Sequence, residues 1–146
     1  MQQVLFESEV PTKKFISWNE YELYIDRIAE WVKYKCDEEI GAIYGLPRGG
    51  LPIAVSLSHR LDLPILMNYY DRKVVTDKKI LVVDDIADTG HTLKDFDNPH
   101  NVMCTMHYHK QSLVTPDFFC TEKHNDWIVY PWETLDSDEV QDYLKS

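Results

Sequence analysis

The chain contains 146 residues, of which 44% are hydrophobic and 12% aromatic, and these proportions fit one globular domain. Its 25 acidic residues outnumber its 15 lysines and arginines, and the formal net charge of -10 argues against nucleic-acid partners, because such binding depends mainly on basic residues. Apolar runs of only about half a dozen residues exclude a membrane-spanning helix, and the first residues lack signal-peptide features, so we expect a cytoplasmic protein without a membrane partner.

The first part of the chain predicts a helix, a strand and a second helix. Ser17 and Glu20 form a capping-box pattern, and apolar residues then recur at helical spacing, which predicts an amphipathic helix over about 18–36. A short apolar run bounded by glycines, 41–45, predicts a strand. A second helix is expected from about residue 50, since a proline such as Pro52 is tolerated in the first turn of a helix.

The middle of the chain predicts three more strands and a short helix. The expected strands are 64–70, 79–85 and 101–109, and the short helix covers about 90–97. Strands that alternate with helices are typical of an α/β fold with a mostly parallel sheet flanked by helices. In such open sheets, ligands bind at the carboxyl ends of the strands.

The pattern weakens after about residue 115, where two short strands are expected around "PDFF" and "DWIVY". We predict a single domain over 1–146, with a core at about 17–112. The N-terminal and C-terminal segments, about 1–16 and 113–146, would form a small hood over the sheet edge. "CTMHYH" has no second Cys/His pair at zinc-site spacing, so no structural zinc is expected.

The clearest functional pattern is "ILVVDDIADTGHTL", residues 80–93. A glycine turn that opens a helix points backbone N–H groups outward, and Thr89 and Thr92 add hydroxyl donors, which together favour a phosphate-binding loop. The simpler alternative is an ordinary helix N-cap. The adjacent Asp84 and Asp85 favour the ligand-binding interpretation, because two neighbouring carboxylates need hydroxyls or a divalent cation near them. A phosphoacceptor site of the receiver type normally has its acidic pair after the first strand, whereas here it follows the third.

A second loop, "GLPRGGLP" at residues 45–52, also leaves a strand and enters a helix. Arg48 supplies a planar charged group, and Gly49 allows the backbone to approach an anion closely. The spacing matches neither a P-loop nor a dinucleotide-binding motif. The alternative is a tight strand–helix turn with a surface arginine. Two anion loops at one sheet edge suggest a ligand phosphorylated at both ends of a sugar.

These motifs resemble a known family. "ILVVDDIADTGHTL" closely resembles the phosphoribosyl pyrophosphate (PRPP) signature of the type I phosphoribosyltransferases, and "YGLPRGGLPIA" looks like their pyrophosphate loop. The segment "PDFFCTEKHNDWIVYPWE" is similar to the one that closes the purine pocket in the xanthine–guanine and archaeal purine members. The resemblance covers about residues 41–133 and implies the type I phosphoribosyltransferase fold.

The resemblance also implies residue roles. Asp84 and Asp85 would bind the ribose hydroxyls, directly and through Mg2+. Arg48 and Gly49 would hold the pyrophosphate, with a non-proline cis peptide just before the arginine. Asp88 would act as the general base near purine N7. The 5'-phosphate would be wrapped by Asp88, Thr89, Gly90, His91 and Thr92. The purine would be bound by Lys110 at its C6 oxygen, by stacking on Trp127 and by the backbone of Ile128.

The expected activity is therefore transfer of the phosphoribosyl group from PRPP to guanine, xanthine or hypoxanthine with release of pyrophosphate, a purine salvage reaction. The family also implies a homo-oligomer, a dimer or tetramer. Members usually carry a long mobile loop between the second and third core strands, whereas here the connection is only 71–77. This departure keeps two alternatives open: a non-catalytic PRPP- or nucleotide-binding regulatory protein, and a transferase for another nucleobase.

Overall fold

The computed structural model describes residues 12–134, and the parts of the expected hood at 1–11 and 135–146 lie outside them. Four parallel strands form the main sheet in the order β2-β3-β4-β5. Their bounds are β2 Ile40–Gly45, β3 Lys79–Ala87, β4 Asn101–Tyr108 and β5 Phe118–Glu122. The expected mostly parallel sheet flanked by helices is confirmed.

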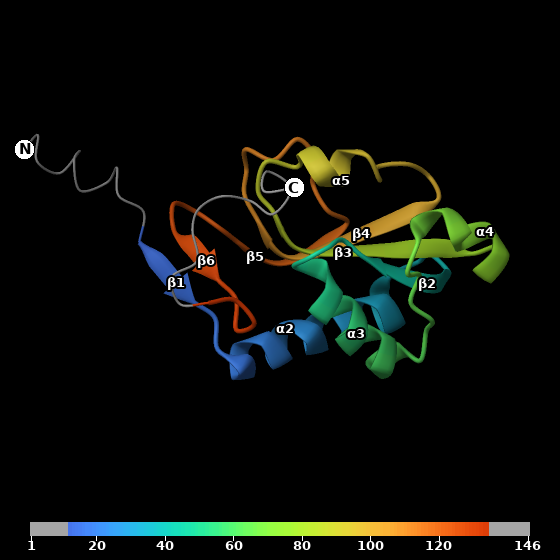
Figure 1. Ribbon diagram of the computed structural model, residues 1–146, viewed down its shortest axis with the longest axis horizontal. Coiled ribbons are helices and arrows are strands. Elements are labelled where there is room, and N and C mark those ends of the chain that lie inside the picture. Colours follow the sequence, from blue (N-terminus) through green and yellow to red (C-terminus); the bar gives the residue numbers. More distant parts are fainter. Residues whose placement is uncertain (1–11, 135–146) are drawn as a thin grey trace, which may run out of the picture.

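Two helices cover one face of this sheet (Figure 1). α2 spans Trp18–Glu30 and continues as the π-helical turn η1, Trp31–Lys35. The predicted capping box at its start is present, since the Ser17 side chain accepts from the Glu20 N–H and the Glu20 carboxylate accepts from the Ser17 N–H. α3, Gly50–Leu61, is the next element after β2 and the loop that leaves it.

Side chains alternate between the two faces of β3, as a strand buried on both sides requires. Leu81 and Val83 pack in the cluster that contains α2 and α3. Ile80 and Val82 pack in a second cluster on the other face, together with Leu93 of the short helix α5, His91–Lys94. α5 is shorter than the helix predicted for about 90–97.

The predicted strand at 64–70 is wrong except for one bridge. Only Ile65 pairs with the outer edge of β2, through Ile43. The Asn68 side chain accepts from the Tyr70 N–H and begins the 3-10 helix η2, Tyr69–Asp71, which leads into α4, Arg72–Val75. Such a local side-chain bond to the backbone competes with strand pairing.

The expected hood is only partly separate from the sheet. β1, Lys13–Phe15, pairs in parallel with β6, Trp127–Val129, in a two-stranded sheet beside the main one (Figure 1). β5, which we placed in the hood, instead extends the main sheet by pairing with β4. Within residues 12–134, no helix is long and apolar enough to cross a bilayer.

Candidate active site

The paired aspartates lie in the last part of β3, which continues to Ala87 rather than ending at Asp85 as predicted. Both carboxylates are half-buried, and the Asp85 N–H donates to the Asp84 carboxylate at 2.8 Å. Gly45, the last residue of β2, is level with Val83. The loop that leaves β2 therefore runs beside the two aspartates.

Contact between this loop and the aspartates occurs at Gly49. A Cβ atom at Gly49 would lie 2.1 Å from one carboxylate oxygen of Asp85, so only glycine fits there without moving that side chain. Arg48 lies exposed just before it, and the Pro47–Arg48 peptide bond is cis, as the resemblance implies. The two motifs therefore meet at the Gly49–Asp85 contact.

The loop from Asp88 to Thr92 connects β3 to α5. Gly90 has φ +82°, a left-handed conformation that side chains disfavour, and it is the N-cap of α5. A Cβ atom there would also lie 2.4 Å from the Ser112 hydroxyl oxygen. The Leu113 N–H donates to the Thr89 carbonyl at 2.8 Å. The segment after β4 thus holds the backbone of this loop in place.

A small pocket lies next to Asp88, with a free volume of about 30 Å³. The Asp88 carboxylate accepts from the Gln111 amide at 3.2 Å and from the Lys123 ammonium at 3.3 Å. The pocket is lined by Asp85, Ile86, Asp88, Lys123, Trp127, Ile128, Tyr130 and Glu133. The structure thus brings Asp88, Trp127 and Ile128 together around one pocket.

Lys110, the residue expected at the purine C6 oxygen, lies outside the pocket lining. It lies beyond the end of β4 with 79% of its side chain exposed, and its ammonium is 3.7 Å from a Glu122 carboxylate oxygen. It is not among the residues that line the pocket, whereas Lys123 is, with only 9% of its side chain exposed. Sequence reasoning missed Lys123 because nothing in "TEKHND" distinguishes a buried lysine from a solvated one.

A buried network behind the aspartates was also missed. The Tyr130 hydroxyl donates to the Asp85 carbonyl at 3.1 Å and lies 2.7 Å from His107 Nδ1. Because the hydroxyl has one proton, His107 Nδ1–H must donate to the tyrosine oxygen. His107 Nε2 is then an unprotonated nitrogen, buried without a partner among the described residues. Burial, with smaller contributions from Lys14 and Lys123, lowers the pKa of His107 to about 4.

We expect this histidine to make stability depend on pH. Its ordinary pKa is 6.5, so between 6.5 and about 4 the unfolded chain binds a proton that the folded chain does not. The contribution of the neutral histidine to the free energy of unfolding is present above pH 6.5. It is lost as the pH drops, by about 2 kcal/mol between about pH 7 and 5. Urea unfolding at both values should show this loss in the wild type and a smaller one in His107→Asn, in which an amide nitrogen replaces Nδ1. Equal losses would contradict the assignment.

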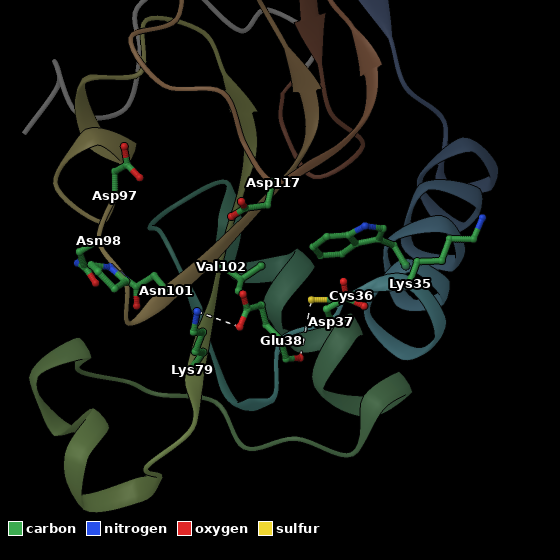
Figure 2. Close-up of a pocket in the computed structure, with 12 residues that line it drawn as sticks. Lys35, Cys36, Asp37, Glu38, Lys79, Asp97, Asn98, Asn101, Val102 and Asp117 are labelled. Atoms are coloured by element: carbon green, nitrogen blue, oxygen red, sulfur yellow. Dashed lines mark hydrogen bonds and ion pairs between the residues drawn. The ribbon is translucent and has the colours of Figure 1, made fainter.

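A larger cavity of about 610 Å³ lies elsewhere, near the first residues of β3 and β4 (Figure 2). Several of its polar groups serve the fold: Glu38 pairs with Lys79 at 2.9 Å, and Asp117 accepts from the Met103 N–H at 2.8 Å. The Asn101 side chain is likewise bonded to Tyr69 and to the Phe96 carbonyl. The aspartates of β3 do not line this cavity, so the smaller pocket is the candidate site.

The site offers hard oxygen donors for Mg2+ at Asp84 and Asp85. No cluster of three or more His, Cys, Asp or Glu suited to a metal is found within residues 12–134. This donor set fits Mg2+, which is usually held by one or two carboxylates together with waters and the phosphates of a ligand. Because Gly49 approaches Asp85 closely, the Gly49 backbone, and not a side chain, borders that side of the carboxylate.

The fold and these loops define a parallel α/β protein with its polar residues gathered at the carboxyl edge of the sheet. Neither a protein-family model nor a curated protein matches the sequence. Several solved structures match the fold. A purine phosphoribosyltransferase from Pyrococcus horikoshii is 28% identical, with a TM-score of 0.67 over 88% of this chain and 99% of its own.

Two further solved structures match the same fold. A xanthine–guanine–hypoxanthine phosphoribosyltransferase from Helicobacter pylori is 19% identical, with a TM-score of 0.64 over 83% of this chain and 94% of its own. A hypothetical protein from Neisseria gonorrhoeae with bound ppGpp is 20% identical, with a TM-score of 0.71 over 87% and 92%. The chain has the fold of the type I phosphoribosyltransferases, and the resemblance seen in its motifs is confirmed. The comparisons support a transferase of that class.

Proposed function

We propose that the protein is a purine phosphoribosyltransferase that transfers the 5-phosphoribosyl group from PRPP to a 6-oxopurine and releases pyrophosphate. The observation that carries the proposal is the contact between the two loops. Gly49 touches the Asp85 carboxylate, and the Asp85 residue also lines the pocket that contains Asp88 and Trp127. Sites for pyrophosphate, ribose and base would thus adjoin one another.

The proposed roles are those that the resemblance implies, and these positions support them. Asp84 and Asp85 bind the ribose hydroxyls, and the N–H groups and hydroxyls of residues 88–92 hold the 5'-phosphate. Arg48 and the Gly49 backbone hold the pyrophosphate. Asp84 and Asp85 would hold Mg2+, which would supply positive charge to stabilise the leaving pyrophosphate. Asp88 accepts the proton that the base loses as its nitrogen bonds to the sugar.

Several features support a purine over a pyrimidine. The P. horikoshii and H. pylori neighbours are named as transferases for purines. Trp127 presents an indole next to Asp88, and a large ring system suits a bicyclic base better than a single ring. Which of guanine, xanthine and hypoxanthine is preferred depends on contacts at purine C2.

The deciding experiment is pyrophosphate release from PRPP and Mg2+ with guanine, xanthine or hypoxanthine, and with adenine, uracil and orotate alongside. We expect release that requires one of the three 6-oxopurines and yields the matching nucleoside monophosphate. Release with orotate or uracil alone would instead identify a pyrimidine transferase. If no base gives pyrophosphate release, the proposal that the protein is a phosphoribosyltransferase is rejected.

A second candidate is a regulatory protein that binds PRPP or a nucleotide without turnover. The N. gonorrhoeae neighbour contains ppGpp, a phosphorylated guanine nucleotide. Between the Ile65 bridge and β3, the chain has only η2 and the single turn α4, so this connection provides no long lid to exclude water. Calorimetry with PRPP, GMP and ppGpp separates the two: tight binding without pyrophosphate release favours the regulator.

A further inference from the structure

The group with the most unusual position in the candidate site is the Lys123 ammonium. It is buried, 3.3 Å from the Asp88 carboxylate and 5.5 Å from the centre of the Trp127 ring, over which it lies. Burial of an ammonium is costly unless it is paired, and these two contacts supply the pairing. The backbone fixes the position, because the Lys123 N–H donates to the Tyr108 carbonyl of β4 at 2.7 Å.

The pocket has no room for a base in this arrangement. Its free volume of about 30 Å³ holds one or two water molecules, much less than a bicyclic ring requires. One of the lining groups must therefore move when a base enters. Lys123 has the longest flexible side chain among them, a four-carbon stem that carries a compact charge. Its contacts are also those that a base would make, the face of Trp127 and the Asp88 carboxylate.

We propose that Lys123 occupies the base position of the empty site and that an entering base displaces it, so that its ammonium then donates to the carbonyl oxygen of the base. This inference rests on the proposed function and assigns the specificity-determining contact to Lys123 instead of Lys110. A base with a carbonyl group offers an acceptor that replaces the Asp88 carboxylate, to which Lys123 no longer donates. A base with an amino group at the same place offers no acceptor, and the buried ammonium loses its partner.

The test compares inosine and adenosine monophosphates, whose bases differ in the group at C6 and in the proton on the adjacent N1, by calorimetry with Mg2+ present. In the wild type we expect the 6-oxo nucleotide to bind at least about 100-fold more tightly, because a buried donor without an acceptor is strongly disfavoured. In Lys123→Met, inosine monophosphate should lose most of that advantage, whereas adenosine monophosphate should bind equally well or more tightly. A general loss of structure would weaken both nucleotides together.

Two other lysines complete the design. Lys79→Met removes an ion-paired lysine at the opposite end of β3, where it contacts Glu38, and should leave the ratio of the two affinities unchanged. Lys110→Met tests the assignment implied by the resemblance. If Lys123→Met does not fold, Lys123→Gln, which keeps a polar group of similar length, should still lower the ratio by about tenfold or more.

The outcomes separate this inference from the proposed function. The role of Lys123 is overturned if the ratio of the two nucleotide affinities stays within about threefold of wild type in the Lys123 variants. It is also overturned if that ratio collapses in Lys110→Met instead. In both cases nucleotide binding still supports the proposed function. A wild type that binds neither nucleotide and releases no pyrophosphate from PRPP overturns both. A collapse of the ratio in Lys123→Met alone supports the inference, even if turnover is absent.

Discussion

Replacement of Asp88 by asparagine is expected to lower kcat for purine transfer by about two orders of magnitude or more, the usual contribution of a general base. Asparagine has nearly the same shape as aspartate, but it keeps only one of the two acceptor oxygens to which Gln111 and Lys123 donate at 3.2 and 3.3 Å. Its amide is not basic, so it does not take a proton from the base. The loss is measured as initial rates of pyrophosphate release at saturating PRPP.

The Asp88→Asn variant also leaves the Lys123 ammonium without its counter-charge, so folding must be measured with activity. Asp117→Asn is the matched control: Asp117 likewise accepts a hydrogen bond, from the Met103 N–H, but lies just before β5, at the opposite end of the sheet. We expect the control to retain nearly full activity. If Asp88→Asn folds, binds PRPP and retains more than about a tenth of the wild-type kcat, Asp88 is not the general base.

The sequence predicted those features of the fold that depend on local pattern. The alternation along β3, the capping box at Ser17 and the loop residues from Asp84 to Thr92 are determined by neighbours in the chain. Hydrophobic periodicity and cap chemistry report such features directly. The family resemblance carries the same information, because its motifs are continuous segments, and the comparisons confirm it.

The features that sequence reasoning missed depend on contacts between distant segments. The burial of Lys123 results from the pairing of β5 with β4, which the weak pattern after residue 115 did not indicate. The apolar run at 64–70 looked like a strand, yet the Asn68 side chain turns the backbone after one bridge. The link from His107 to Tyr130 spans 23 positions and has no local signal.

The second large effect is expected at Gly49, where an added methyl group should weaken PRPP binding by about tenfold or more, equivalent to at least about 1.4 kcal/mol. Gly49 has φ -64° and ψ -29°, which alanine adopts readily, so Gly49→Ala changes the available space and not the backbone preference. The new Cβ would lie 2.1 Å from a carboxylate oxygen of Asp85 and must displace that group. Mg2+ demands nearly ideal ligand geometry, so a carboxylate displaced by about an ångström binds it poorly.

Gly41 provides the matched control within the same strand–loop unit. A Cβ atom there would lie 2.0 Å from the Thr76 hydroxyl oxygen, an equally close contact with a side chain, but near the start of β2 and away from the aspartates. Calorimetry of PRPP with Mg2+ should therefore show weaker binding in Gly49→Ala and nearly wild-type binding in Gly41→Ala. Equal weakening in both would indicate general loss of packing. Unchanged affinity in Gly49→Ala would mean that PRPP does not use the Asp85 carboxylate, and the proposed arrangement of pyrophosphate and ribose around the Gly49–Asp85 contact would be wrong.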